Sequence, residues 1–181
     1  MVNRDLQGIV GELGVCKAFN RLAKKYHTRY VHNVPIKGVT SLQQIDAVLV
    51  TPFGYYAIEV KNWLGIISCS PKDYYWTVTY DKRDLYTKSP IIQNAQHCRY
   101  LARNFKKTFE SLIIFPDNVV LSNPVEYTIQ VTDIEKFFVG KERIYTDEQV
   151  DATYEQIVTL KQELEIMSIA DSIYREGERL S

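Results

Sequence analysis

The spacing of apolar residues predicts an α-helix at the start of the chain. Between Asp5 and Tyr26 these residues recur near the 3.6-residue period of a helix, at Leu6, Ile9, Val10, Leu13, Cys16 and Leu22. Gly8, Gly11 and Gly14 lie inside the same segment at three-residue intervals. Each glycine costs about 1 kcal/mol against alanine in a helix interior. We therefore expect this side of the helix to approach a sheet or a substrate backbone closely.

The stretch from Gln44 to Lys61 predicts a β-hairpin. Two runs rich in β-branched and aromatic residues flank the turn sequence Thr-Pro-Phe-Gly. If Pro52 and Phe53 form a two-residue loop, Asp46 lies opposite Glu59, and Glu59 shares a strand face with Lys61. A bulge at the glycine would instead shift the pairing by one residue and move Asp46 to the other face.

The rest of the chain alternates short strands with helices. Strands are expected near residues 30–34, 66–69, 74–80, 85–87, 112–115, 119–121 and 127–131, with a loop over 36–41 and a hairpin turn at 81–84. Ser89 should cap a helix that has Pro90 at its first position. One face of this helix is apolar, with Ile91, Ala95, Cys98, Ala102 and Phe105. The opposite face, with Gln93, Gln96, His97 and Tyr100, reads either as a solvent face or as a polar wall over the acidic hairpin.

The last third of the chain is predicted to be helical. Residues 133–138 suit one or two helical turns. Thr146 with Gln149 forms a capping box, from which a helix is carried onward by apolar residues at Val150, Tyr154, Ile157, Val158 and Leu160. A second helix is expected over 164–179. We assign residues 132–181 to an acidic helical C-terminal extension, whose apolar stripes suit packing on the body or on a second copy as a homo-oligomer.

Composition and cysteine content indicate an ordinary soluble protein. Hydrophobic residues make up 45% and charged residues 24%. No apolar run approaches the ~20 residues that span a bilayer, and no signal peptide is visible, so no membrane partner is expected. The three cysteines are widely spaced, which predicts reduced thiols and a cytoplasmic location. They make no zinc-ligand spacing with the three histidines.

The formal net charge is zero, but the charge is unevenly distributed. Residues 1–132 hold 16 lysines and arginines against 10 acidic residues, and residues 133–181 hold 6 against 12. This asymmetry predicts two segments with different tasks. Nucleic acid is the expected partner of the basic part, and the candidate phosphate contacts are Lys82, Arg83, Arg99, Arg103, Lys106 and Lys107.

The hairpin also supplies the candidate chemistry. Its first strand is apolar on both faces and therefore looks internal, and a carboxylate on an internal strand must be paired or bound to a metal. Asp46 and Glu59, if they face each other, repel. A divalent cation would compensate them, and Lys61 adds a charge of the right sign. The alternative from the residues alone is a solvated cross-strand ion pair.

Five short motifs in order make the chain resemble the nuclease-related domain (NERD) family, a branch of the PD-(D/E)xK nuclease superfamily, over about residues 5–121. They are Gly11-Glu12-Leu13-Gly14, Gln44-Ile45-Asp46, Ile58-Glu59-Val60-Lys61-Asn62, Gly65-Ile66-Ile67 followed by Trp76, and Ser89-Pro90-Ile91-Ile92-Gln93. The family usually has asparagine before that proline, where this chain has Ser89. The resemblance implies an α/β fold with a restriction-endonuclease-like core, a central mixed β-sheet flanked by helices, and a nuclease-like domain over 1–131.

The same resemblance implies a Mg²⁺-dependent nuclease site, with Mn²⁺ as a substitute. Asp46 and Glu59 would be metal ligands, the Val60 carbonyl would join them, and Glu12 would reach the metal directly or through water. Lys61 would position the attacking water and stabilise charge at the scissile phosphate, and Gln93 would orient substrate or water. DNA is the favoured substrate, although the residues themselves do not distinguish DNA from RNA.

Two other functional classes are compatible with this sequence. A nucleic-acid-binding or regulatory module could keep the fold with weak or no catalysis. An assembly protein could use its acidic helical tail for association and its first domain as scaffold. Glu12, Asp46, Glu59 and Lys61 are all present, which favours the enzyme.

Overall fold

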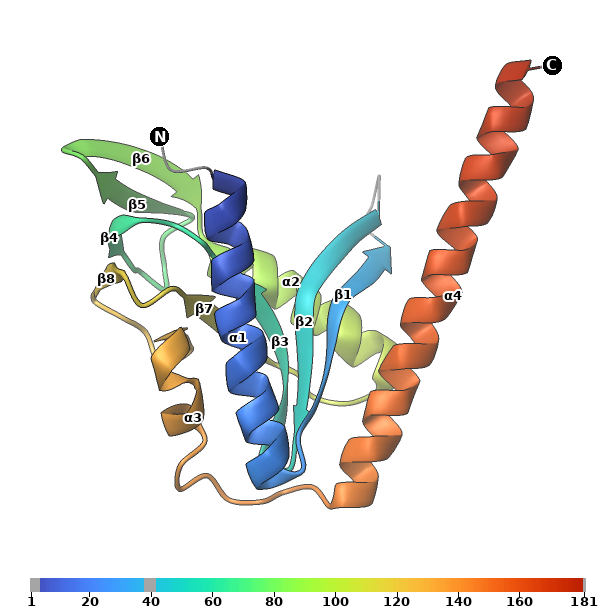
Figure 1. Cartoon of the computed structure of the whole chain (residues 1–181), viewed down its shortest axis with the longest axis horizontal. Coiled ribbons are helices and arrows are strands. Elements are labelled where there is room, and N and C mark those ends of the chain that lie inside the picture. The colour runs from blue at the N-terminus through green and yellow to red at the C-terminus, as the bar shows by residue number, and fades with distance from the viewer. Residues whose placement is uncertain (1–3, 38–41, 181) are drawn as a thin grey trace.

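The computed structural model describes residues 4–37 and 42–180, and the side chains of residues 13–37 and 43–172. Two sheets and four α-helices form the described part (Figure 1). The helices are α1 (Arg4–Tyr26), α2 (Pro90–Phe105), α3 (Ile134–Phe137), which follows a 3₁₀ turn η1 (Val131–Asp133), and α4 (Asp147–Leu180). No helix in this part is long and apolar enough to cross a membrane.

The larger sheet is mixed and has the strand order β1-β2-β3-β7-β9. Its strands are β1 (Arg29–Lys37), β2 (Leu42–Thr51), β3 (Gly54–Val60), β7 (Glu110–Phe115) and β9 (Thr128–Gln130). The first three pair antiparallel, whereas β7 runs parallel to β3 and β9 runs parallel to β7. The expected loop over 36–41 begins later than predicted, because β1 continues to Lys37; residues 38–41 lie outside the described residues.

The smaller sheet has the order β6-β5-β4-β8. Its strands are β4 (Gly65–Ser68), β5 (Tyr75–Tyr80), β6 (Arg83–Lys88) and β8 (Val119–Ser122). The turn predicted over 81–84 is tighter, because Asp81 and Lys82 alone form the loop, with φ of 49° and 60° as in a type I′ turn. Gly65 is the first residue of β4 and has φ 98°. A Cβ there would lie 2.1 Å from the Thr79 carbonyl oxygen on β5, so only glycine fits at this position.

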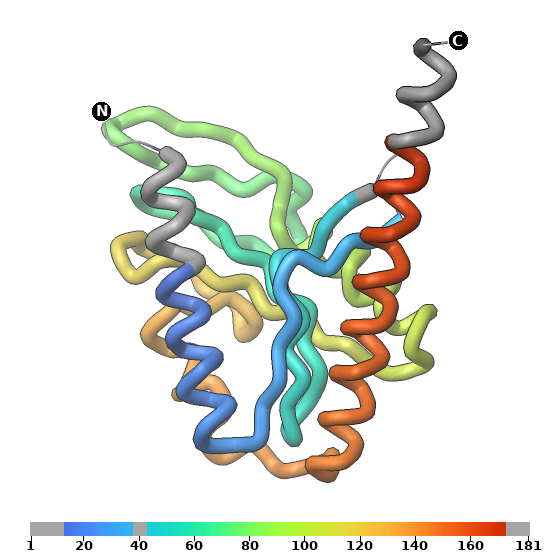
Figure 2. Tube along the Cα trace, turned by 45° about the vertical axis from the view of Figure 1, so that its right-hand side comes forward, coloured from blue at the N-terminus to red at the C-terminus, as the bar shows by residue number. Residues whose placement is uncertain are grey.

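Helices cover both faces of the larger sheet. On one face α1 and α3 pack on β2, β3 and β7 through a core that includes Phe19, Leu49, Tyr56 and Phe138. On the other face α2 and α4 pack through a core that includes Val48, Tyr55, Leu101, Val150 and Ile157. Figure 2 shows α1 and α4 on opposite sides of the strands. This arrangement is the expected restriction-endonuclease-like core with a C-terminal helix.

The hairpin register is the predicted one. Ala47 pairs with Ile58 and Thr51 pairs with Gly54, so Pro52 and Phe53 form a two-residue loop and the bulge alternative does not occur. The Thr51 hydroxyl fixes the turn, because it donates to the Gly54 carbonyl at 2.9 Å and accepts the Phe53 N–H at 3.0 Å.

Two helix predictions need correction and one is confirmed. Ser89 stands at the N-cap position of α2, but its side chain makes no capping hydrogen bond. The capping box of α4 forms as predicted. The Thr146 N–H donates to the Gln149 side-chain oxygen at 2.9 Å, and the Gln149 N–H donates to the Thr146 hydroxyl at 3.3 Å. The two helices predicted after it are one continuous helix, since Lys161, Gln162 and Glu163 between them are good helix formers.

One glycine of α1, Gly14, differs from expectation. A Cβ on Gly14 would meet the Val131 side chain at 3.3 Å, so this glycine allows α1 to approach the turn η1 rather than a sheet or a substrate. The side-chain surroundings of Gly8 and Gly11 lie outside the described residues.

Candidate active site

The candidate site begins where the β2–β3 ladder ends. Beyond the Ala47–Ile58 pair, the Asp46 carboxylate accepts the Val60 N–H at 2.7 Å. A side-chain oxygen thus replaces the backbone acceptor at this position. The hydrogen bond holds Asp46 against β3 at the point where Glu59 and Lys61 leave the strand.

Glu59 is a buried carboxylate with one charged partner at contact distance. Its side chain is only 3% exposed, and Oε1 lies 2.5 Å from the Lys61 ammonium. Oε2 has no hydrogen-bond partner among the described residues. Burial, and then the neighbouring Asp46 charge, raises the pKa of Glu59 against the lowering effects of Lys61 and of the Gln93 side chain. The alternative of a solvated ion pair is therefore wrong, because this pair lies inside the protein.

Lys61 links the hairpin to α2. Its backbone N–H donates to the Ile114 carbonyl at 2.9 Å, which continues the parallel pairing of β3 with β7. Its ammonium donates to the Gln93 Oε1 at 3.2 Å and lies 5.9 Å from the centre of the Trp63 ring. The sheet and α2 therefore fix the lysine together, with its side chain 20% exposed.

Asn94 anchors α2 over the site. Its Nδ2 donates to the Ala57 carbonyl at 2.8 Å and to the Ser111 hydroxyl at 2.9 Å, on β3 and β7 respectively. The buried stripe of α2 consists of Pro90, Asn94, His97 and Leu101. The buried face of α2 therefore differs from the predicted apolar face. Asn94 is buried because it forms hydrogen bonds with β3 and β7, and His97 is buried beside Glu59 of β3.

His97 belongs to the polar wall over the acidic hairpin. It is 1% exposed, and its Nδ1 lies 3.6 Å from the Glu59 Oε2. Burial lowers the pKa of His97 to about 4, and the Lys61 charge acts in the same direction, so the imidazole is neutral at pH 7. The solvent-face interpretation is wrong for this residue. Its position one helical turn after Gln93 was the signal that could have placed it at the site.

The third predicted carboxylate is not placed. Glu12 lies on α1, but its side chain is outside the described residues. Within the described ranges, no group of three histidine, cysteine, aspartate or glutamate side chains forms a metal cluster. The structure thus brings together Asp46, Glu59, Lys61 and Gln93 from the predicted set, with Val60 bonded to Asp46.

The predicted basic residues fall into separate groups. Arg99 and Arg103 line a hollow of about 330 Å³ with Lys37. Lys106 caps the C-terminus of α2 in the left-handed conformation, and Lys107 donates to Gln156 on α4 at 3.2 Å. Lys82 and Arg83 are at the tip of the β5–β6 hairpin, away from the C-terminal end of α2 (Figure 1).

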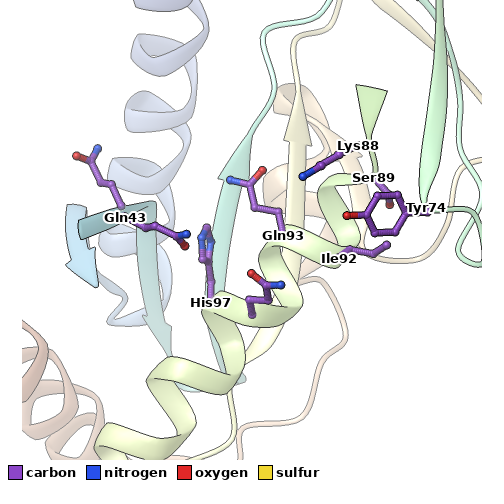
Figure 3. Close-up of a pocket in the computed structure, with 9 residues that line it drawn as sticks. Gln43, Tyr74, Lys88, Ser89, Ile92, Gln93 and His97 are labelled. Carbon is purple, nitrogen blue, oxygen red and sulfur yellow. The ribbon is translucent and has the colours of Figure 1, made fainter. Parts of the chain in front are cut away.

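A cavity of about 360 Å³ is lined by Gln93 and His97 (Figure 3), the two α2 residues that lie next to Lys61 and Glu59. Ile92, Gln93, Gln96 and His97 from α2 form one wall. Gln43 and Gln44 come from β2, Lys88 from the end of β6, Tyr74 from just before β5, and Ser89 from between β6 and α2. Figure 3 shows the ammonium end of Lys88 turned toward Gln93. The sequence did not single out Tyr74, Lys88, Gln43 or Gln44 as site residues, because they come from three segments that only the fold brings together.

Comparison with known proteins gives one family. The family model described as nuclease-related domain (NERD) matches residues 7–116. A solved crystal structure of a protein of unknown function, AF1548, is 17% identical over 90% of this chain and 96% of that chain, with a TM-score of 0.35. The search of the curated proteins found no match.

Proposed function

The chain belongs to the nuclease-related domain family, and from this premise we propose that it is a Mg²⁺-dependent nuclease that hydrolyses phosphodiester bonds, with DNA as the favoured substrate. The observation that carries the proposal is the buried Glu59 carboxylate of raised pKa, beside Asp46, Lys61 and Gln93. Ionisable groups whose pKa is shifted by burial and by specific charged neighbours are typical of functional sites.

The donor set fits a hard divalent cation. Asp46, Glu59 and the Val60 carbonyl would hold it, with Glu12 as the further ligand, and all are the oxygen ligands that Mg²⁺ prefers. Glu59 Oε2 is buried without a hydrogen-bond partner among the described residues, which is costly for a carboxylate unless a cation compensates it. When bound, the cation would supply charge neutralisation at the phosphate, and Mn²⁺ could replace it.

Lys61 and Gln93 would act on the substrate. The Lys61 ammonium is held by Glu59 at 2.5 Å and by Gln93 at 3.2 Å, so its charge is fixed in advance where a phosphate oxygen would gain charge. Gln93 borders the cavity, and its amide would orient the water or the phosphate beside the lysine. Further along α2, Arg99 and Arg103 would bind neighbouring phosphates.

One nuclease assay tests this function. The full chain is incubated with single- and double-stranded DNA and RNA in Mg²⁺, Mn²⁺ or EDTA. We expect cleavage with either metal and none in EDTA, and losses of about 10²-fold or more for Asp46→Asn and Lys61→Ala. The control is Lys136→Ala, which removes an exposed lysine of α3 that pairs with Asp133.

Two outcomes would contradict the proposal. Undiminished cleavage in EDTA would exclude a metal-dependent reaction, and full activity in both site variants would move the chemistry elsewhere. Salt-sensitive binding with no cleavage in any metal would leave the alternative, a nucleic-acid-binding or regulatory module with the same fold.

A further inference from the structure

The cavity beside the carboxylates shares two residues with the candidate active site. Gln93 accepts a hydrogen bond from Lys61, and His97 lies 3.6 Å from Glu59, while both side chains line the cavity. A group bound there would therefore sit next to any phosphate held by Lys61. The residues that would hold the metal and the phosphate, Asp46, Glu59 and Lys61, do not line the cavity. The side chains that do line it must therefore indicate what binds there.

The walls of this cavity are fixed by hydrogen bonds between elements. The Ser89 N–H donates to the Tyr74 carbonyl at 2.8 Å, which joins the start of β5 to the start of α2. Tyr75 and Lys88 pair across β5 and β6. On the β2 side, Gln44 donates to the Asn33 side chain at 2.8 Å. The cavity is thus a feature of the folded framework.

The lining is polar and carries no carboxylate among the described residues. It contains four glutamine amides, Gln43, Gln44, Gln93 and Gln96, with Lys88 as its one cation. Each amide offers both donors and an acceptor, as do the edges of nucleobases. Tyr74 is 50% exposed, so the aromatic ring is available for stacking. Amide hydrogen bonds together with an aromatic face are the usual means of reading an unpaired base.

One buried polar atom of the lining, the Ser89 Oγ, lacks a partner within the described part of the chain, in a residue that is 1% exposed. The His97 Nδ1 faces Glu59 instead, at 3.6 Å from its Oε2. Buried polar groups are ordinarily satisfied, so the Ser89 hydroxyl indicates a polar occupant. A base carries donors and acceptors on one rigid ring and can satisfy groups of either kind.

A second hollow continues from the first. It shares Gln43 and Gln96 with the cavity and adds Lys37, Arg99 and Arg103. A strand could therefore place its phosphates along the basic side chains while one of its bases enters the cavity. A base inside a duplex has its pairing edge and both faces occupied, so only an unpaired or flipped base can enter.

From this juxtaposition we propose that the cavity between β2, α2 and the β5–β6 hairpin is a subsite for one unpaired nucleobase. The protein then selects single strands, or duplexes with an extrahelical base, over perfect duplexes. This inference rests on the proposed nuclease function for the role of the neighbouring phosphate, but base binding can be measured without cleavage.

The test uses fluorescence anisotropy with labelled oligonucleotides in Ca²⁺, with a gel to confirm that the strands stay intact. The probes are a perfect duplex, the same duplex with one extrahelical base, the same bulge with an abasic residue, and a single strand, each as DNA and as RNA. We expect the bulged duplex and the single strand to bind about tenfold or more tightly than the perfect duplex and the abasic bulge. Whether DNA or RNA binds better identifies the source of the base.

Matched variants locate the effect. Tyr74→Ala and Gln96→Ala should reduce the preference to within about twofold. Tyr86→Ala and Gln162→Ala should preserve it, because Tyr86 is exposed on β6 and Gln162 is exposed on α4, and neither lines the cavity. Thermal melts of each variant check that it is folded.

The outcomes separate this inference from the proposed function. Equal binding of the intact and abasic bulges, no binding of any probe, or equal losses in the control variants overturns the base subsite, even if the protein cleaves DNA. Base-selective binding that depends on Tyr74 and Gln96 supports the subsite, even if no cleavage occurs in Mg²⁺ and the nuclease proposal fails.

Discussion

Replacing Asp46 by asparagine separates a charge effect from a hydrogen-bond effect. Asparagine has the same shape and can still accept the Val60 N–H that Asp46 accepts at 2.7 Å. What it loses is the negative charge that helps to raise the pKa of Glu59. Metal-free Asp46→Asn should therefore show how much the two carboxylates repel each other.

The magnitude follows from the hairpin register. Asp46 and Glu59 each lie one residue beyond the Ala47–Ile58 pair that ends the β2–β3 ladder, and opposed positions on antiparallel strands put Cβ atoms about 5 Å apart. Two unit charges at that separation repel by about 3 kcal/mol at an effective dielectric constant near 20. A neutral acceptor in place of the carboxylate weakens the bond to Val60 by about 1 kcal/mol. We expect a net gain of about 2 kcal/mol in the free energy of unfolding at pH 8, or about 4–8 °C in Tm for a chain of this size.

The sign of this effect should change with pH. Because the folded pKa of Glu59 is raised, the folded protein keeps a proton that the unfolded chain releases. The stability of the metal-free wild type therefore falls as pH rises from the unfolded pKa through the folded pKa of Glu59. Below that window Glu59 is neutral and the repulsion is absent, so Asp46→Asn should be about 1 kcal/mol less stable than wild type.

The assay is thermal unfolding of both proteins at acidic pH and at pH 8, in EDTA and in Mg²⁺. Mg²⁺ at a hundredfold excess over Kd should stabilise wild type by about 2.7 kcal/mol and leave the variant nearly unchanged. The control is Asp117→Asn, because Asp117 is exposed and accepts the Thr132 N–H at 2.9 Å. Equal melting of wild type and Asp46→Asn at both pH values, or equal stabilisation by Mg²⁺, would refute the reasoning.

Three further predictions test the frame around the site. Asn94→Ala should lower the free energy of unfolding by about 2–3 kcal/mol in denaturant melts, because the Ala57 carbonyl loses a buried donor, whereas the exposed Asn104→Ala should cost far less. Ile157→Ala should cost about 2–5 kcal/mol and Ile169→Ala almost nothing, since these α4 residues are 0% and 61% exposed; equal effects would contradict the packing of α4 on the sheet. Arg99→Ala and Arg103→Ala should each reduce the slope of log K against log salt for nucleic-acid binding by about 1, and unchanged slopes would place the phosphate contacts elsewhere.

The sequence predicted those features that depend on neighbouring residues. The Pro52-Phe53 loop fixed the strand register, which pairs Ala47 with Ile58 and so leaves Asp46 and Glu59 as the next residues of the two strands. The capping box at Thr146 located the start of α4 to within a residue. In each case the deciding interactions join residues a few positions apart, so periodicity and turn chemistry were sufficient.

The features that it missed depend on contacts between distant segments. Asn94 and His97 are polar, so the pattern put His97 on an outward face, but partners on β3 and β7 make their burial possible. The cavity likewise joins β2, the β5–β6 hairpin and α2. The role of Ser89 was misjudged for the opposite reason, since a good capping residue makes no capping bond and instead stands at the cavity.

The surroundings of Glu59 explain why a cation, rather than another side chain, is the expected partner of its second oxygen. Oε1 faces the Lys61 ammonium, and Oε2 faces His97, whose pKa of about 4 keeps the ring neutral at pH 7. When both carboxylates are ionised, the one lysine leaves a net charge of about −1 on a set in which Glu59 is buried and Asp46 and Lys61 are half-buried. A protonated His97 would cancel that charge and weaken the attraction for an external cation. Burial of His97 therefore keeps the carboxylates under-compensated, at a cost in stability that a purely structural ion pair would not require.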